Sequence, residues 1–144
     1  MKKYRQLNQN DFDHQFALET RWGDMDGLGH INHAMYLAYM ETARVEYYSS
    51  LGFSDIRMNQ DPSTILGGIN IEYINQIEHP AQLIICHRIN RVGFKSFDFL
   101  GAIFQNDETH PSFAGIFKMI SFDYNNQKTV EVPQIIRNRC WYDR

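Results

Sequence analysis

One uninterrupted helical segment, followed by a long run of β-type sequence, constrains the fold of this chain more than any other feature. Residues 32–50 contain no Pro or Gly and are rich in Ala, Met, Leu and Glu, and Asn32 suits the N-cap position. Gly52 follows where a helix stop is expected. The apolar side chains of this segment cover more than one narrow stripe, so we expect a helix that is buried on most of its sides.

The remaining sequence has the composition of β-strands. Strands are predicted at 15–22, 64–77, 82–91, 96–105 and 113–124, where β-branched and aromatic residues concentrate between turn residues. A short terminal helix is expected near the C-terminus, whereas residues 1–15 show no clear period. One long helix among several antiparallel strands predicts an α+β architecture in which the sheet curls around the helix. Such a sheet has open edges, which an identical subunit could cover.

Length and composition narrow the functional classes. A chain of 144 residues with 43% hydrophobic residues predicts one domain spanning 1–144 and excludes a wholly disordered protein. The 14 basic and 17 acidic residues give a net charge of -3, which argues against bulk nucleic-acid binding. The sequence has neither a membrane-spanning apolar run nor the apolar core of a signal peptide, so we expect a cytoplasmic protein. Cys86 and Cys140 form no CxxC pattern and are expected to be ordinary thiols.

The densest cluster of ionisable residues lies in the glycine-rich loop before the helix. Asp24, Asp26, His30 and His33 fall within ten residues, together with Asn32. Carboxylates and imidazoles are the usual general bases, and the N-terminus of a buried helix offers unpaired N–H groups that stabilise an oxyanion. The junction therefore predicts two parts of an acyl-transfer site. The alternative is that the acidic loop only caps the helix.

Residues 22–44 resemble the signature of the 4-hydroxybenzoyl-CoA thioesterase family of hotdog-fold acyl-CoA thioesterases. The shared features are an aromatic residue, an Asp-x-Asp pair, a Gly, a Tyr on the first helical turn and a Glu-x-x-Arg pair, here Trp22, Asp24, Asp26, Gly27, Tyr36, Glu41 and Arg44. The resemblance extends to 92–97, 114–123 and 132–133. It implies a curved antiparallel sheet wrapped around one central helix, a homodimer or homotetramer with the site at the subunit interface, and hydrolysis of an acyl-CoA or acyl-carrier-protein thioester. No cofactor is implied, because coenzyme A is part of the substrate.

The resemblance also assigns roles to individual residues. Asp26 matches the catalytic carboxylate, which acts as nucleophile or general base, whereas Asp24 is expected to be structural. His33 matches the helix start, where a backbone N–H polarises the thioester carbonyl and the side chain is in reach of substrate or product. His30 matches the catalytic-type His of the plant acyl-carrier-protein thioesterases, although Leu28 stands where those enzymes have Asn.

Substrate contacts are expected from four further residues. Asn32 is placed to orient water, and Tyr36 is expected near the acyl group, although its row on the helix also predicts core packing. The phosphates of coenzyme A require cations, for which Lys95, beside the Gly93 turn, and Arg91 are the first candidates. The alternative for each cation is an ordinary solvated surface charge. The acyl group itself is not determined, since Tyr36, Ile65, Phe94 and Phe97 suit aryl and aliphatic groups equally.

Three other interpretations concern the same stretches of sequence. His30 and His33 could chelate a metal, but no third strong ligand is placed beside them, so we predict no metal site. Glu41 and Arg44, at i and i+3, predict a helix ion pair. The pair at 67–68, Gly-Gly, predicts a strand bulge or a close approach to the helix.

Two rival functions stay open at this point. The first is a non-catalytic acyl-CoA-binding hotdog domain. The second is a hotdog hydratase or dehydratase, but the His and Asp pair expected on its central helix is not visible in residues 32–50. Thioester hydrolysis that depends on Asp26 would separate the proposed enzyme from both.

Overall fold

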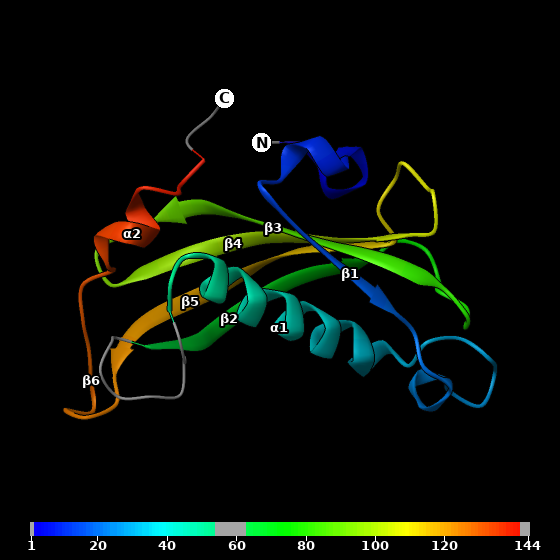
Figure 1. The fold of residues 1–144 in the computed structure, drawn as a ribbon, viewed down its shortest axis with the longest axis horizontal. Coiled ribbons are helices and arrows are strands. Elements are labelled where there is room, and N and C mark those ends of the chain that lie inside the picture. Colours follow the sequence, from blue (N-terminus) through cyan, green and yellow to red (C-terminus); the bar gives the residue numbers. More distant parts are fainter. Residues whose placement is uncertain (1, 54–62, 142–144) are drawn as a thin grey trace.

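The computed structural model describes residues 2–53 and 63–141. Five long strands form one antiparallel sheet in the order β1-β3-β4-β5-β2, and a short β6 pairs with β5. The strands are β1 His14–Glu19, β2 Ser63–Tyr73, β3 Gln82–Val92, β4 Ser96–Gln105, β5 Phe113–Asp123 and β6 Lys128–Thr129. The helices are α1 His33–Ser50 and the short α2 Gln134–Arg137. Figure 1 shows α1 lying against one face of the sheet, whose strands bend around it, which confirms the expected hotdog arrangement.

The boundaries of α1 agree with the local signals in the sequence. The side chain of Asn32 accepts a hydrogen bond from the Ala34 N–H at 2.9 Å, as an N-cap does. After the helix, Gly52 has a φ of 98°, a conformation that glycine adopts without strain. The inward face of α1 is buried against aromatic side chains of the sheet, and its members include Tyr36, Met40, Ala43 and Tyr47. The prediction that Tyr36 and its row on the helix pack in the core is therefore confirmed. The expectation that α1 is buried on most of its sides is wrong, because the opposite face, which includes Ala38, Thr42 and Val45, is exposed.

Two strands are shorter than predicted because the chain turns away to build other structure. β1 ends at Glu19, and Trp22–Asp24 form a 3₁₀ turn. β2 ends at Tyr73, because the next two backbone N–H groups, of Ile74 and Asn75, both donate to the Ser112 carbonyl, at 2.8 and 3.0 Å. Both departures lead into the candidate site described below.

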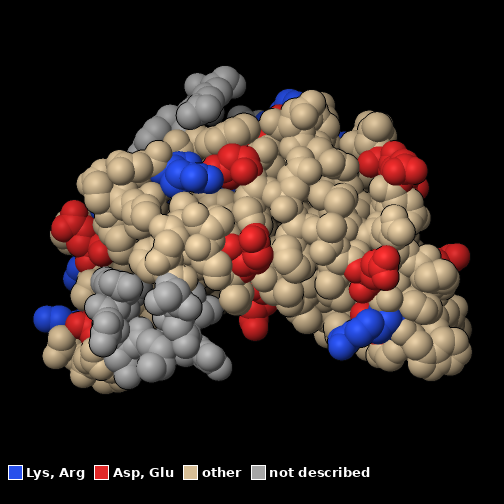
Figure 2. Space-filling model, viewed as in Figure 1, with Lys and Arg blue, Asp and Glu red and all other residues tan. Residues whose placement is uncertain are grey.

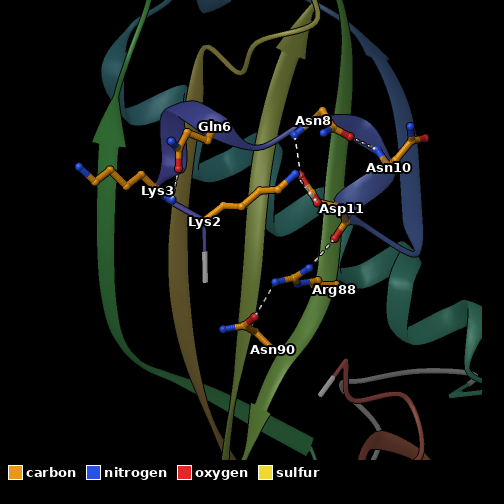
Figure 3. Close-up of polar contacts among 8 residues, drawn as sticks. All are labelled: Lys2, Lys3, Gln6, Asn8, Asn10, Asp11, Arg88 and Asn90. Atoms are coloured by element: carbon orange, nitrogen blue, oxygen red, sulfur yellow. Dashed lines mark hydrogen bonds and ion pairs between the residues drawn. The ribbon is translucent and has the colours of Figure 1, made fainter. Parts of the chain in front are cut away.

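The N-terminal segment covers the face of the sheet opposite α1. Leu7 and Phe12 are buried there in a second apolar cluster with residues of β3, β4 and β5. Polar contacts hold the segment in place, since the Arg88 guanidinium on β3 donates to the Asp11 carbonyl at 2.9 Å and Lys2 pairs with the Asp11 carboxylate (Figure 3). The segment without a sequence period is thus an ordered cover for the outer face of the sheet.

The prediction that Glu41 and Arg44 form an ion pair is wrong. Glu41 is exposed, whereas Arg44 is only 6% exposed and places its guanidinium over the Phe117 ring, 4.8 Å from the centroid. The side chain of Arg44 therefore packs inward on the aromatic core instead of reaching along the helix surface.

The glycine pair of β2 and the two cysteines lie in ordered parts of the sheet and the core. A register shift between Leu66 and Gly68 in the β2–β5 pairing confirms the predicted bulge. Cys86 and Cys140 are both buried. Within residues 2–53 and 63–141, no helix is both long and apolar enough to cross a bilayer.

Candidate active site

A cavity of about 420 Å³ lies at the N-terminal end of α1. Its walls come from the loop before α1, the first turn of the helix and the chain that leaves β2. Four residues predicted from the sequence line this cavity, namely Asp26, His30, His33 and Tyr36. The fold therefore brings together the expected carboxylate, both imidazoles and the start of the helix.

The loop holds the Asp26 carboxylate by only one of its oxygens. Asp26 Oδ1 accepts hydrogen bonds from the Leu28 N–H at 2.8 Å and the His30 N–H at 3.2 Å. The Asp26 N–H donates to the His30 carbonyl at 2.7 Å, and Gly29, at a φ of 86°, closes the turn. Among residues 2–53 and 63–141, no hydrogen bond reaches Oδ2. The carboxylate is thus fixed in orientation while one oxygen stays available for chemistry.

The first residue of α1, His33, lines the same cavity. Asn32 is the N-cap, and its own N–H donates to the Asp24 carbonyl at 2.8 Å. The Ala34 and Met35 N–H groups are both satisfied by Asn32. The His33 N–H has no backbone acceptor in the described part of the chain. A free N–H at the positive end of a helix can polarise a carbonyl.

His30 lies between the loop and the chain that follows β2. Its Nε2 lies 3.6 Å from a carboxylate oxygen of the exposed Glu78, and the two backbones form an isolated antiparallel bridge. The ring is partly exposed and lines the cavity, so it can hold a water or a leaving group there. The expected position of His30 in the site is therefore supported by its geometry.

Aromatic rings form the inner wall of the cavity. Tyr36 is buried, and its hydroxyl accepts a hydrogen bond from the Ile77 N–H at 3.2 Å. Its ring stands edge-on to the ring of Tyr73, with the two centroids 5.1 Å apart, and its centroid lies 5.4 Å from that of the Phe113 ring. The Tyr73 hydroxyl donates to the His33 carbonyl at 2.9 Å, which ties β2 to the first turn of α1. Burial raises the pKa of both tyrosines, so they act as neutral apolar walls with a polar rim.

Several expected contacts are not brought to the cavity within one chain. The Asn32 side chain is committed to capping α1 and is not among the lining residues. Lys95 and Arg91 lie at the opposite end of the sheet, where the Arg91 guanidinium binds the Asp98 carboxylate at 2.8 and 3.1 Å. The candidate acyl contacts Ile65, Phe94 and Phe97 are also absent from the lining. Phe97 is fully buried in the core.

Among the described residues, no Lys or Arg lines the cavity. Figure 2 shows that the face of the molecule carrying α1 has a broad uncharged area with scattered charges rather than a basic patch. In the part of the chain that the structure describes, no group of three or more His, Cys, Asp or Glu side chains is placed to hold a metal ion. The site is thus a carboxylate, imidazole and amide site.

Three polar lining residues were missed by the sequence analysis: Tyr73, Asn75 and Gln76. They lie about 40 residues after the loop and reach it through the pairing of β2 with β5. The signal that could have located them is the end of the alternating pattern after Tyr73, where the strand was instead extended to residue 77.

Comparisons with known proteins show which family this chain resembles. A family model described as the thioesterase-like superfamily matches residues 20–140. The uncharacterized protein YsmA of Bacillus subtilis (strain 168) is 25% identical over 115 residues, which cover 78% of this chain and 75% of that protein.

Solved structures show the same fold at low sequence identity. The PA5185 protein of Pseudomonas aeruginosa strain PAO1 is 24% identical, with a TM-score of 0.83 and coverage of 92% of both chains. A thioesterase from Thermus thermophilus, solved with coenzyme A and zinc, is 22% identical, with a TM-score of 0.77. The match covers 89% of this chain and 91% of that one. A DHNA-CoA thioesterase from Staphylococcus aureus is 21% identical, with a TM-score of 0.75. The match covers 87% of this chain and 84% of that one. Since the family model spans most of the chain, from the loop before α1 to the end of α2, the chain belongs to the thioesterase-like superfamily.

Proposed function

We propose that this protein hydrolyses an acyl-CoA or acyl-carrier-protein thioester to a carboxylic acid and a thiol. The observation that carries the proposal is that Asp26 and His33 line one cavity. Among the described residues, Asp26 Oδ2 accepts no hydrogen bond and the His33 N–H has no backbone acceptor. A carboxylate oxygen can attack the thioester carbonyl or remove a proton from an attacking water. The helix N–H can stabilise the oxyanion that develops on the carbonyl.

Two paths give the same products. If Asp26 attacks, an acyl-enzyme anhydride forms and the thiolate leaves. Water then splits the anhydride, which releases the acid and regenerates Asp26, and the proton freed from Asp26 passes to the thiolate to give the thiol. If Asp26 acts as a general base, water attacks directly and the proton passes through the carboxylate to the leaving sulfur. In both paths His30 is the side chain we assign to water or leaving-group contact, because Asn32 is committed to the helix cap.

We propose that the working unit is a homodimer formed along the outer edge of β2. β2 is the last strand of the sheet, and its exposed apolar side chains are Leu66, Ile69 and Tyr73, each 44–46% exposed. An open strand edge with apolar flanks favours pairing with a second strand, and two-fold symmetry makes that pairing antiparallel. A dimer of dimers would need a further surface, and residues of the N-terminal segment already cover the outer face of the sheet.

This dimer would also explain where cations for coenzyme A come from. The Lys95 carbonyl accepts the Ser121 N–H of β5 at 2.9 Å, and Ser121 pairs with Thr64 of β2. Lys95 therefore lies at the end of the sheet where β2 starts, with β5 between them. Antiparallel pairing places the start of one β2 beside the end of the other, where Tyr73 lines the cavity. Lys95 and Arg91 of a second copy are therefore our candidates for the coenzyme A phosphates. The coenzyme A in the Thermus thermophilus relative supports this class of ligand.

The cellular setting follows from the proposed substrate. Acyl-CoA and acyl-carrier-protein thioesters are intracellular metabolites. We therefore propose that the protein acts in the cytoplasm.

The test is thiol release from a panel of acyl-CoA and acyl-carrier-protein thioesters that differ in chain length and aromatic character. Hydrolysis of at least one member, with saturation at micromolar to millimolar substrate, is the expected result. Tight binding of acyl-CoA without thiol release would overturn the enzymatic function in favour of a binding domain. Hydration of an enoyl thioester without hydrolysis would favour a hydratase.

A further inference from the structure

We propose that Asp24 is a positioning residue that fixes the catalytic loop onto α1 through the hydroxyl of Tyr39. This inference rests on the proposed thioester hydrolysis, in which Asp24 would act by holding Asp26 and His33 in place. The Asp24 carboxylate is only 2% exposed, and its Oδ2 accepts the Tyr39 hydroxyl at 2.6 Å. Tyr39 lies on α1, on the side of the helix away from the β2 edge, and is itself buried.

Asp24 joins three segments of the chain at one point. Its carboxylate accepts the Arg21 N–H at 3.0 Å and the Arg21 guanidinium at 3.2 Å, which closes the 3₁₀ turn at the end of the β1 connection. Its backbone carbonyl accepts the Asn32 N–H at 2.8 Å, which fixes the start of α1. The turn, the helix N-cap and the second turn of the helix are thus held by a single residue.

The charge of Asp24 strengthens this junction. Burial raises the pKa of Asp24, but the hydrogen bonds from Tyr39 and Arg21 together outweigh it, so the pKa is lowered and the carboxylate is ionised near neutral pH. Burial, together with the same carboxylate, raises the pKa of Tyr39, so its hydroxyl remains a donor. A hydrogen bond to an ionised acceptor is about twice as strong as one between neutral groups.

The proposed attacking group, Asp26, and the proposed oxyanion donor, the His33 N–H, both lie next to this junction in the sequence. Asp26 follows Asp24 by two residues, and His33 follows Asn32 by one. The Met25 and Ile31 backbones form a bridge that carries the loop from the junction to the cavity. A shift of the junction would move the attacking oxygen and the oxyanion donor together, and misplacement by about 1 Å can lower the rate about 100-fold.

The chain offers a matched control for the loss of a buried tyrosine hydroxyl. Tyr47 lies two turns after Tyr39 on the same helix, is fully buried, and donates its hydroxyl to the Asp13 carboxylate at 3.4 Å. Tyr39→Phe and Tyr47→Phe therefore remove the same group from the same helix, one beside the catalytic loop and one remote from it. A purely structural role predicts that both variants lose thermal stability and keep the wild-type turnover.

We expect Tyr39→Phe to lower kcat about 10-fold or more while KM stays within about threefold, and Tyr47→Phe to leave both unchanged. Asp24→Asn, whose amide oxygen can still accept the Tyr39 hydroxyl, should keep more kcat than Asp24→Ala. Wild-type kcat in Tyr39→Phe, with a loss of Tm no larger than that of Tyr47→Phe, would overturn the inference.

Amide hydrogen exchange tests the same junction without any substrate. The Leu28 and His30 N–H groups, which bind Asp26 Oδ1, should exchange faster in Tyr39→Phe and at the wild-type rate in Tyr47→Phe. Unchanged exchange at both amides in Tyr39→Phe would contradict the inference. If the wild type released no thiol from any thioester, the proposed function would fail while exchange would still decide the role of Asp24.

Discussion

The two oxygens of the Asp26 carboxylate have different tasks. Oδ1 accepts two backbone N–H groups and so shapes the loop, while Oδ2 has no hydrogen-bond partner among the described residues. A replacement by Asn can keep an oxygen acceptor for the loop and remove the negative charge. The role of Asp26 in the loop and its proposed role in the reaction are therefore separable by mutation.

At His33, the backbone rather than the side chain is expected to do the chemistry, and proline can test this. His33 is the first residue of α1, where proline is well tolerated, and Asn32 before it has a φ of -56° and a ψ of 133°, which suits a residue before proline. We expect His33→Pro to fold normally and to lose about 100- to 1000-fold in kcat, because it removes the oxyanion donor. Steady-state kinetics and circular dichroism measure the two effects.

The control for that variant is His33→Ala, which removes the imidazole and keeps the N–H. We expect its kcat to stay within about fivefold of the wild type. If His33→Ala lost as much activity as His33→Pro, the imidazole would be the active group and the helix N–H would not.

At the level of single residues, the sequence predicted what is local and missed what depends on packing. Asp26, His30 and His33 share one loop-to-helix junction, so their proximity follows from the sequence alone. Tyr73 reaches the same cavity only because β2 pairs along the whole of β5, which no local pattern specifies. Arg44 was assigned to an ion pair from its spacing, but burial over the Phe117 ring determines its position.

Among the elements, the outer edge of β2 is where we propose that two subunits meet. Ile69 lies in the middle of this strand, is 44% exposed and pairs with Phe117 of β5. We expect Ile69→Lys to convert the homodimer to a monomer, because a charge on an edge strand opposes pairing with a second strand. Sedimentation velocity gives the mass, and thiol release should fall with it if the second copy supplies the coenzyme A cations.

Tyr124→Lys is the matched control, since Tyr124 is 46% exposed but lies after β5, away from the β2 edge. It should leave the mass unchanged. An Ile69→Lys protein that stayed dimeric would show that the subunits meet elsewhere, and a wild-type monomer would contradict the assembly altogether.

The elements were predicted well where their ends have a chemical signal. The Asn32 cap and Gly52 define α1 to within one residue, and the turns around β3 and β4 define those strands closely. The ends of β1 and β2 are predicted too late, because the chain leaves the sheet there: a 3₁₀ turn follows β1, and the N–H groups after β2 donate to the Ser112 carbonyl. The N-terminal sequence has no period because its two short 3₁₀ turns, Tyr4–Gln6 and Gln9–Asp11, bury none of their own residues. Within residues 2–15, only the isolated side chains of Leu7 and Phe12, which follow the turns, are buried.

In the molecule as a whole, a buried histidine links stability to pH. His87 on β3 is fully buried, and burial, with the charges of Arg44 and His14 facing it, lowers its pKa well below the ordinary value. Below about pH 6.5 the unfolded chain binds a proton at this position that the folded chain does not. The free energy of unfolding should therefore fall with decreasing pH, by up to about 1.4 kcal/mol per pH unit from this group.

His87→Leu removes that proton and should make the decline between about pH 6.5 and about pH 5 shallower by up to the same amount. Urea unfolding of both proteins at several pH values measures the slopes. Parallel slopes would mean that His87 becomes protonated in the folded protein.

The account depends most on Asp26 as the group that carries thioester hydrolysis. The most direct measurement is kcat/KM of wild type and Asp26→Asn on the best acyl-CoA of the panel, together with the affinity of each for a non-hydrolysable acyl-CoA thioether. We predict a loss of about 100- to 10,000-fold in kcat/KM with thioether affinity retained. Hydrolysis by Asp26→Asn within about threefold of the wild type would contradict the account.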